Sequence, residues 1–336
     1  MIDMQRREAG QNTGSRDGWA DDIRRGRHPR SANAAELTAW RASTVDRLGG
    51  LLALDTGRAD GRLIFDGEEE RRLITLVTAD GDIPCWLLTP APDVRLDLAV
   101  VAVAGHGGGI DDLVAPPGAG DFHGGVAHKL VAAGFTVLCP EMISFGRRRT
   151  PMPRSEPPAG SSCQVDGMRG LLTGLPVLGR RVADTMAAVR ALRTVEGIDP
   201  AKVAVIGGSG GGAVALITAA LDDQIPAAVV AAFLSSFVNS FCEVPHCICN
   251  AVPDLLTWFE MADVAALIAP RGLIIEAGRQ DPIFRISATE ATYAELVDVW
   301  RGVGAESPDL VITDAGHQFR ANEAIALLRR HLLGTP

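Results

Sequence analysis

The sequence predicts an α/β fold in which a mostly parallel central sheet carries helices on both faces. Short apolar runs typical of buried strands alternate with longer helical patterns along the 336-residue chain. The apolar fraction of 47% is sufficient for a large core. One buried run, at 203–206, passes through a glycine-rich turn directly into an alanine-rich helical pattern at 209–221.

The elements follow in a regular order. A helix is expected at 34–48, followed by strands at 72–78 and 84–88 that form an antiparallel hairpin around a turn rich in Asp and Gly. Further strands are expected at 98–103, 135–139, 203–206, 227–233, 273–277 and 310–313. Helices are expected at 122–133, 181–196, 209–221, 287–300 and 319–333. The stretches 140–178 and 234–270 are too long for ordinary connections, so we expect cap-like excursions over a functional site.

A Gly-x-Ser-x-Gly turn lies between the strand and the helix noted above, formed by Gly207, Ser209 and Gly211. A strand, a sharp turn and a helix are the setting that a nucleophilic serine requires. The turn is so tight that the two flanking positions must lack a Cβ atom. The helix N-terminus beneath the serine favours a developing oxyanion. The alternative is a glycine-rich turn with no chemical role.

An acid and a histidine follow at matching positions. Asp281 comes just after the strand 273–277, and His317 comes just after the strand 310–313. The carboxyl ends of parallel strands meet at one edge of a sheet, where such folds place their ligands. In this interpretation His317 takes the proton of Ser209, and Asp281 holds the imidazole in the correct tautomer.

Two other acids compete for the role of Asp281. Asp314 lies three residues before His317 and is better interpreted as a loop residue or a cap. Glu276 lies inside the strand, where an unpaired carboxylate is rare, so we expect it to have a partner that the sequence does not identify.

A second glycine-rich loop, Gly105-His106-Gly107-Gly108-Gly109, follows the apolar strand at 98–103. Glycines allow the backbone to approach a ligand and leave N–H groups pointing inward. We expect an oxyanion hole in which the backbone of His106 or Gly107 donates together with the N–H of Gly210. The imidazole of His106 is expected to have a structural role.

These motifs resemble the α/β-hydrolase superfamily, and within it the dienelactone hydrolase and acetyl xylan esterase-like group. Further similar segments are 179–184, 197–203 and 268–284, and the resemblance extends over about residues 70–333. It implies the α/β-hydrolase fold and the Ser-Asp-His triad. The sequence departs from the family at two places. Dienelactone hydrolases use a cysteine where Ser209 stands, and the usual His-Gly before the oxyanion loop is Ala104-Gly105 here.

The departure at Ser209 favours ester or acyl chemistry over dienelactone hydrolysis. We expect a serine hydrolase that cleaves a small or medium carboxylic ester through an acyl-enzyme. An acyltransferase, a lactone-forming cyclase or a peptidase would use the same triad. A binding protein that retains only the fold is a third reading, and the complete triad argues against it.

Six cysteines are scattered along the chain, which favours reduced thiols over a disulfide framework. Cys242, His246, Cys247 and Cys249 lie within eight residues, but their spacing fits no common zinc motif. The sequence therefore predicts no metal and no other cofactor, and in relatives a segment of this kind faces the active-site mouth. The residues expected to line the substrate pocket are Phe145, His246, Cys247 and Phe284.

The net charge of −9 argues against partners that need a basic face, namely nucleic acids and anionic membranes. The first residues lack the apolar core of a secretory signal, so a cytoplasmic location is expected. Residues 1–33 are predicted to form a polar, poorly ordered arm before a single domain at 34–336. An arm that packs on a partner in a homodimer is the alternative. The run Arg147-Arg148-Arg149 is expected to form a solvated face, or else to attract an anionic substrate.

Overall fold

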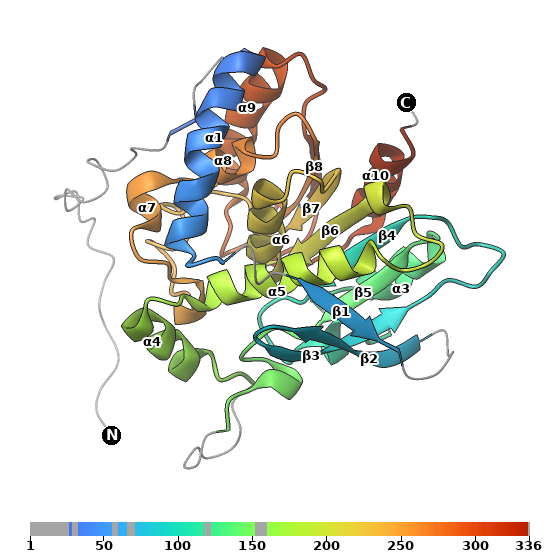
Figure 1. The fold of residues 1–336 in the computed structure, drawn as a ribbon. Helices are drawn as coiled ribbons and strands as arrows, with labels where there is room; N and C mark the ends of the chain where they lie inside the picture. Colours follow the sequence, from blue (N-terminus) through green and yellow to red (C-terminus); the bar gives the residue numbers. More distant parts are fainter. Residues whose placement is uncertain are drawn as a thin grey trace.

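The computed structural model describes residues 27–28, 33–55, 60–65, 71–116, 118, 122–151 and 160–334. Within these residues the strands form one nine-stranded sheet in the order β1-β2-β3-β5-β4-β6-β7-β8-β9 (Figure 1). The strands are β1 (Gly61–Ile64), β2 (Arg71–Thr78), β3 (Gly81–Leu88), β4 (Ala99–Val103), β5 (Thr136–Pro140), β6 (Val203–Gly208), β7 (Ala227–Ala231), β8 (Gly272–Gly278) and β9 (Asp309–Thr313).

The sheet is antiparallel at one edge and parallel elsewhere. β1, β2 and β3 form an antiparallel meander, and β3 joins β5 in the antiparallel sense. All the remaining pairs are parallel. The predicted hairpin is confirmed, because Thr78 pairs with Gly81 across its turn. The edge strand β1 was not predicted, since four residues are too few to display an alternating pattern.

Helices cover both faces of the sheet, which confirms the predicted fold class. One apolar core contains buried residues of α1 (Ala34–Leu51), α5 (Val177–Leu192), α6 (Gly210–Leu221), α8 (Met261–Ala266) and α9 (Ile286–Gly302). A second core on the opposite face contains residues of α2 (Ile110–Leu113), α3 (Val126–Ala132) and α10 (Asn322–Leu333). None of the helices in the described ranges has the length and apolar character needed to cross a membrane.

Both predicted excursions contain regular structure that the sequence did not indicate. The first holds the short 3-10 helix η2 (Gly146–Arg148) and the helix α4 (Cys163–Thr173), and the second holds η4 (Ile248–Asn250) and α7 (Leu255–Trp258). A further 3-10 turn, η3 (Pro200–Lys202), precedes β6. The two excursions are in contact. Gly167 of α4 packs so closely on Ile248 of η4 that a Cβ atom at Gly167 would not fit.

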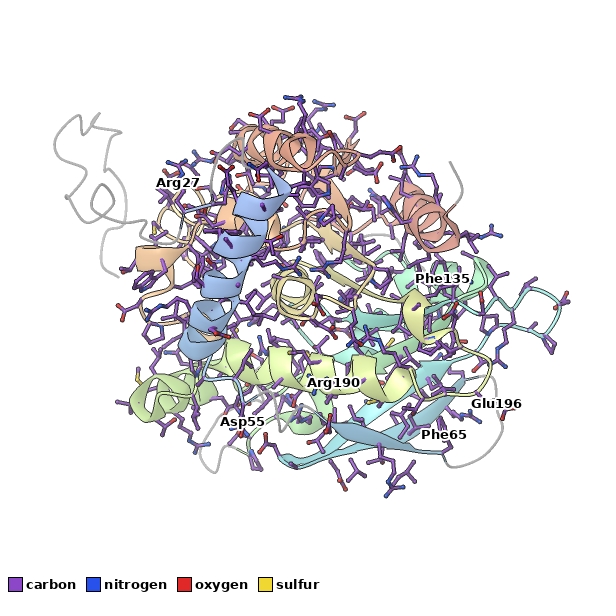
Figure 2. The ribbon with its side chains drawn as sticks, turned by 45° about the horizontal axis from the view of Figure 1, so that its top comes forward. Arg27, Asp55, Phe65, Phe135, Arg190 and Glu196 are labelled. Atoms are coloured by element: carbon purple, nitrogen blue, oxygen red, sulfur yellow. The ribbon has the colours of Figure 1, made fainter. Side chains whose placement is uncertain are left out.

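Two residues of the predicted N-terminal arm pack on the domain. The backbone N–H of His28 donates to Asp263 at 2.8 Å, and its imidazole Nδ1 lies 2.7 Å from the same carboxylate oxygen. Both side chains are buried. Arg27, which is labelled in Figure 2, pairs with Glu295 of α9 at 3.5 Å. The rest of the predicted arm, apart from Asn33, lies outside the described residues.

Candidate active site

Ser209 occupies the sharp turn between β6 and α6 in a backbone conformation that side chains rarely adopt. Its φ of 53° and ψ of −120° are those of a strained residue. A Cβ atom at Gly207 would overlap the carbonyl of Gly211, and a Cβ atom at Gly211 would overlap the carbonyl of Val103. The two flanking glycines are therefore required by backbone packing, and the turn presents the Ser209 hydroxyl at the end of the sheet.

Ser209, His317 and Asp281 form a continuous chain of hydrogen-bonding atoms. The Nε2 atom of His317 lies 2.9 Å from Oγ of Ser209, and its Nδ1 atom lies 2.8 Å from Oδ2 of Asp281. The other oxygen of Asp281 accepts from the backbone N–H groups of Ile283 at 2.8 Å and Phe284 at 3.1 Å. Asp281 is buried, and these donors hold its carboxyl group in place beside the imidazole.

The competing acid Asp314 points into solvent. Its side chain is 86% exposed and pairs with Nε of Arg279 at 3.1 Å. It is thus the loop residue that the sequence indicated, and Asp281 is the carboxylate that meets His317.

Glu276 has the partners that the sequence could not identify. Its buried carboxylate accepts from the backbone N–H of Arg320 at 2.6 Å and from that of Ala321 at 2.9 Å. These two residues follow His317 in the chain, so Glu276 anchors the segment that carries the histidine. Burial raises the pKa of Glu276 to about 6, while the two N–H groups act in the opposite direction.

The Glu276→Gln variant is expected to change how stability depends on pH. The folded pKa is about 6 and the ordinary value is 4.5, so folding favours the protonated carboxyl group. The contribution of this group to the free energy of unfolding is about 2 kcal/mol. It is fully present below about pH 4.5 and is lost as the pH rises through about 6. Denaturant unfolding from pH 4 to 7 should show this loss in the wild type and not in Glu276→Gln. Equal slopes in both proteins would contradict the assignment.

In the glycine-rich loop at 105–109, two backbone N–H groups form hydrogen bonds that fix the loop. Gly105 donates to Nε2 of His123 at 3.0 Å, and Gly108 donates to Oδ2 of Asp112 at 3.0 Å. A side chain at Gly105 would overlap the ring of Phe122, so the loop passes closely over its neighbours.

A buried carboxylate, Glu141, joins the end of this loop to the first excursion. It accepts from the N–H of Ile110 at 3.0 Å and from that of Arg147 at 3.2 Å. The glycines at 109 and 146 have positive φ and approach the Glu141 side chain too closely for a Cβ atom. Burial raises the pKa of Glu141, against the effect of the two N–H donors.

The N–H groups of His106, Gly107 and Gly210 donate to no group within the described part of the chain. Gly210 is the first residue of α6, so its N–H has no partner inside the helix. A Cβ atom added at Gly210 would lie 3.5 Å from the backbone nitrogen of His106, which places the loop beside the helix start. These three N–H groups include the donors that the sequence predicted for an oxyanion hole, namely His106 or Gly107 together with Gly210.

A cavity of about 350 Å³ opens beside Ser209. Among the described residues its lining includes no Asp, Glu, Lys or Arg, and five of its side chains are aromatic or histidine rings other than the imidazole of His317. The lining residues are His106, Ser209, Gly210, Phe233, Phe241, Pro245, His246, Cys247, Asn250, Ile283, Phe284 and His317. A larger hollow of about 760 Å³ lies by Arg72 and Arg95 and contains no member of the triad.

Of the predicted pocket residues, His246, Cys247 and Phe284 line this cavity and Phe145 does not. The prediction for Phe145 was wrong, since its ring is buried beneath the His106 imidazole at a centroid distance of 5.2 Å. The sequence missed Phe241, whose ring stacks on that of His246 at 4.0 Å. Nothing in the local pattern marks Phe241, because the wall forms only when the second excursion folds back over the site. Burial lowers the pKa of His246, and the neighbouring His317 adds to this effect.

The predicted solvated arginine face is confirmed for Arg147 and Arg149, which are exposed, whereas Arg148 is half-buried. Arg147 pairs with Asp111 at 2.8 Å, and Arg148 pairs with Asp184 at 2.6 Å. Arg147 and Arg148 each have a carboxylate partner, and attraction of an anionic substrate by this run stays a prediction.

The chain is similar to several known proteins. Residues 156–248 match the acetyl xylan esterase family model. YtaP of Bacillus subtilis (strain 168), named as a hydrolase, is 28% identical over 214 residues, which cover 61% of this chain and 67% of that protein. A Bacteroides fragilis structure described as an acetyl xylan esterase aligns with a TM-score of 0.71 at 17% identity, over 87% of this chain and 79% of that one. A glucuronoyl esterase from Caldicellulosiruptor kristjansonii aligns with a TM-score of 0.62 at 16% identity, over 92% and 91%.

The structure has the α/β-hydrolase fold. Part of its sequence resembles the acetyl xylan esterase family, and a larger part resembles a hydrolase. The family match, the hydrolase relative and the fold together support a carboxylic ester hydrolase.

Proposed function

We propose that this protein is a serine hydrolase that cleaves small or medium carboxylic esters through an acyl-enzyme on Ser209. The observation that carries the proposal is the hydrogen-bonded chain from Ser209 through His317 to Asp281. An imidazole between a serine hydroxyl and a buried carboxylate is the arrangement that activates serine for attack on an acyl carbon.

In this mechanism Oγ of Ser209 attacks the ester carbonyl as its proton moves to Nε2 of His317. Asp281 stabilises the imidazolium that forms, because its oxygen lies 2.8 Å from Nδ1. The negative charge on the former carbonyl oxygen is stabilised by the N–H groups of His106, Gly107 and Gly210. The proton on His317 then passes to the leaving alcohol. Water, activated by the same imidazole, releases the acid.

The cavity favours a neutral, partly apolar acyl group. Its walls include Phe233, Phe241, Ile283 and Phe284, and the described lining contains no Asp, Glu, Lys or Arg. The similar proteins are named for acetyl xylan and glucuronoyl esters, so acetylated and uronoyl sugar esters are the first substrates to test.

The test combines labelling with product analysis. A fluorophosphonate probe should label Ser209, and p-nitrophenyl acetate should be hydrolysed. Adding a competing alcohol or amine distinguishes hydrolysis from acyl transfer, because a transferase would give mainly the new ester or amide. Absence of both labelling and ester cleavage in folded protein would contradict the proposal.

The Phe241→Ala variant is expected to shift acyl-chain preference towards longer chains. Removing the ring opens the wall beside His246, and each added methylene that fits a pocket is worth about 1–3 kcal/mol in discrimination. The ratio of kcat/KM for p-nitrophenyl hexanoate to that for the acetate should rise about tenfold or more. Phe65→Ala, which removes an exposed ring outside the cavity, is the matched control. An unchanged ratio in Phe241→Ala would show that this wall does not contact the acyl group.

A further inference from the structure

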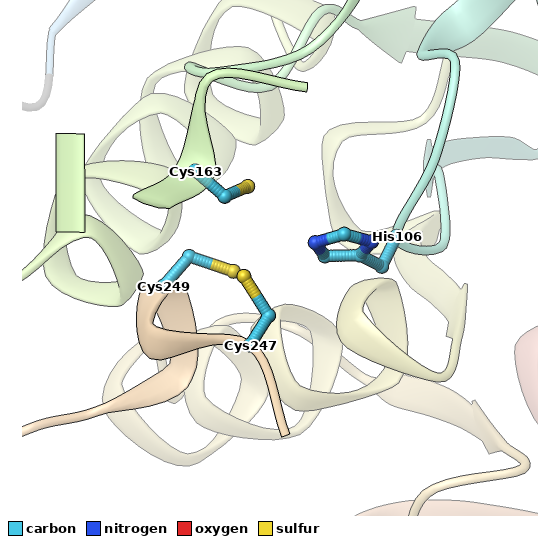
Figure 3. Close-up of side chains that lie close together, drawn as sticks. All are labelled: His106, Cys163, Cys247 and Cys249. Atoms are coloured by element: carbon cyan, nitrogen blue, oxygen red, sulfur yellow. The ribbon is translucent and has the colours of Figure 1, made fainter. Parts of the chain in front are cut away.

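Four side chains that can bind a metal converge beside the candidate active site (Figure 3). His106 comes from the oxyanion loop, Cys163 is the first residue of α4, and Cys247 and Cys249 lie at η4. Their ligand atoms all lie within 4.8 Å of one another. The sequence analysis considered a metal only within the segment 242–249, and the structure assembles a different set from three distant segments.

We propose that His106, Cys163, Cys247 and Cys249 bind a zinc ion. Three thiolates and one imidazole form one of the ligand sets of structural zinc sites, with tetrahedral geometry. Sulfur ligands select zinc over magnesium or calcium, which prefer oxygen. Four protein ligands leave no open position for water or substrate, so the ion is structural and takes no part in the chemistry at Ser209.

The three segments are held in place by contacts of their own. The N–H of Ser162 donates to the carbonyl of Ser144 at 2.9 Å, which fixes the chain just before Cys163. Ile248, between the other two cysteines, packs on α4 at Gly167, where no side chain would fit. The thiols therefore face one another across a close helix contact.

A buried guanidinium supports thiolates at this place. Arg181 is 1% exposed, and it donates to Sγ of Cys163 and to Sγ of Cys249, each at 3.3 Å. Its other partners are the carbonyl of Ile143 and the ring face of Phe145, and no carboxylate of the described residues forms an ion pair with it. A fully buried cation requires a negative partner. Three thiolates, one divalent ion and one guanidinium sum to zero charge, so the site and Arg181 together are neutral.

The other two candidates of the local segment are separate from this cluster. Cys242 is exposed, and His246 stacks on Phe241 in the pocket wall. A disulfide is the main alternative use of the thiols. It would join only two sulfurs, and it would remove the negative charge that Arg181 requires.

Zinc at this place would connect the oxyanion loop to both excursions. His106 would bind the ion through its imidazole while its backbone N–H faces the space beside Ser209. The ion would thus hold the loop and the pocket wall at Cys247 in a fixed relation.

The experiment measures metal in the full chain. Protein expressed with zinc and purified without chelators should contain one zinc per chain by elemental analysis. Protein expressed in cobalt-supplemented medium should show the visible absorption of tetrahedral cobalt and a thiolate-to-cobalt charge-transfer band. The cobalt spectrum is recorded on the wild-type chain, so it does not depend on whether a variant folds.

Cys163→Ser and Cys249→Ser should each lower zinc affinity more than about 100-fold and weaken the charge-transfer band. Cys242→Ser, which changes an exposed thiol of the same segment, should retain both the zinc and the spectrum. Folded wild type without zinc or a tetrahedral cobalt spectrum would overturn the proposal, and so would a disulfide between two of the cluster cysteines found by mass spectrometry. Labelling of Ser209 is read separately, so failure of the zinc site would not be confused with failure of the proposed function.

Discussion

Replacing Ser209 by alanine is expected to lower kcat for ester hydrolysis by at least about 10³-fold, because no acyl-enzyme can form without the hydroxyl. The fold should survive, since alanine is the smaller residue and the strained turn depends on Gly207 and Gly211. Initial rates with p-nitrophenyl acetate and thermal unfolding of both proteins measure the two effects. Fluorophosphonate labelling should disappear together with the activity.

Ser43→Ala is the matched control, because it removes a hydroxyl on the surface of α1 that donates to the local carbonyl of Trp40. This variant should retain turnover and labelling. Near-normal turnover in Ser209→Ala, with the fold intact, would exclude Ser209 as the nucleophile and with it the acyl-enzyme mechanism.

The Asp281→Asn variant is expected to lose about 10³–10⁴-fold in kcat. The carboxylate accepts from Nδ1 of His317, whereas an amide that presents its NH₂ group would favour the tautomer with the proton on Nε2. That tautomer cannot accept the proton of Ser209. Steady-state kinetics over a range of pH should show the loss across the whole active range, as expected for a wrong tautomer.

Asp314→Asn provides a matched comparison, because this exposed carboxylate lies three residues before His317 and, among the described residues, pairs with Arg279 alone. It should change kcat less than about twofold, in keeping with the small value of surface ion pairs. A larger loss in Asp314→Asn than in Asp281→Asn would show that Asp281 is not the catalytic carboxylate. Far-UV circular dichroism of both variants separates loss of function from loss of fold.

The sequence predicted the sheet and the triad positions because both depend on local patterns. Buried parallel strands appear as continuous apolar runs, and each candidate side chain follows directly after one of them. The nucleophile turn is the clearest case, since Gly207 and Gly211 are dictated by the backbone around Ser209. The expected and observed helix boundaries differ by a few residues. For example, the helix expected at 181–196 is α5, which spans Val177–Leu192.

The features that the sequence did not predict depend on contacts between distant segments. The expectation for Phe145 failed because a loop position alone does not tell which side of the loop faces the cavity. The metal ligands were judged within one segment, and their true neighbours, His106 and Cys163, are brought close only when the two excursions pack together. The helix α4 was missed because its glycines obscure the apolar period, although Gly167 is the residue that permits its close packing.

The contact between His28 and Asp263 limits how far the N-terminus of this chain can be truncated without loss of stability. Asp263 is 1% exposed, and the bonds from His28 satisfy one oxygen of its carboxylate. A truncation at Asn33, where the first helix is capped, would leave that buried oxygen without its donors, at a cost of about 1–3 kcal/mol or more for a charged group. Deletion series for expression or crystallisation should therefore keep Arg27 and everything after it.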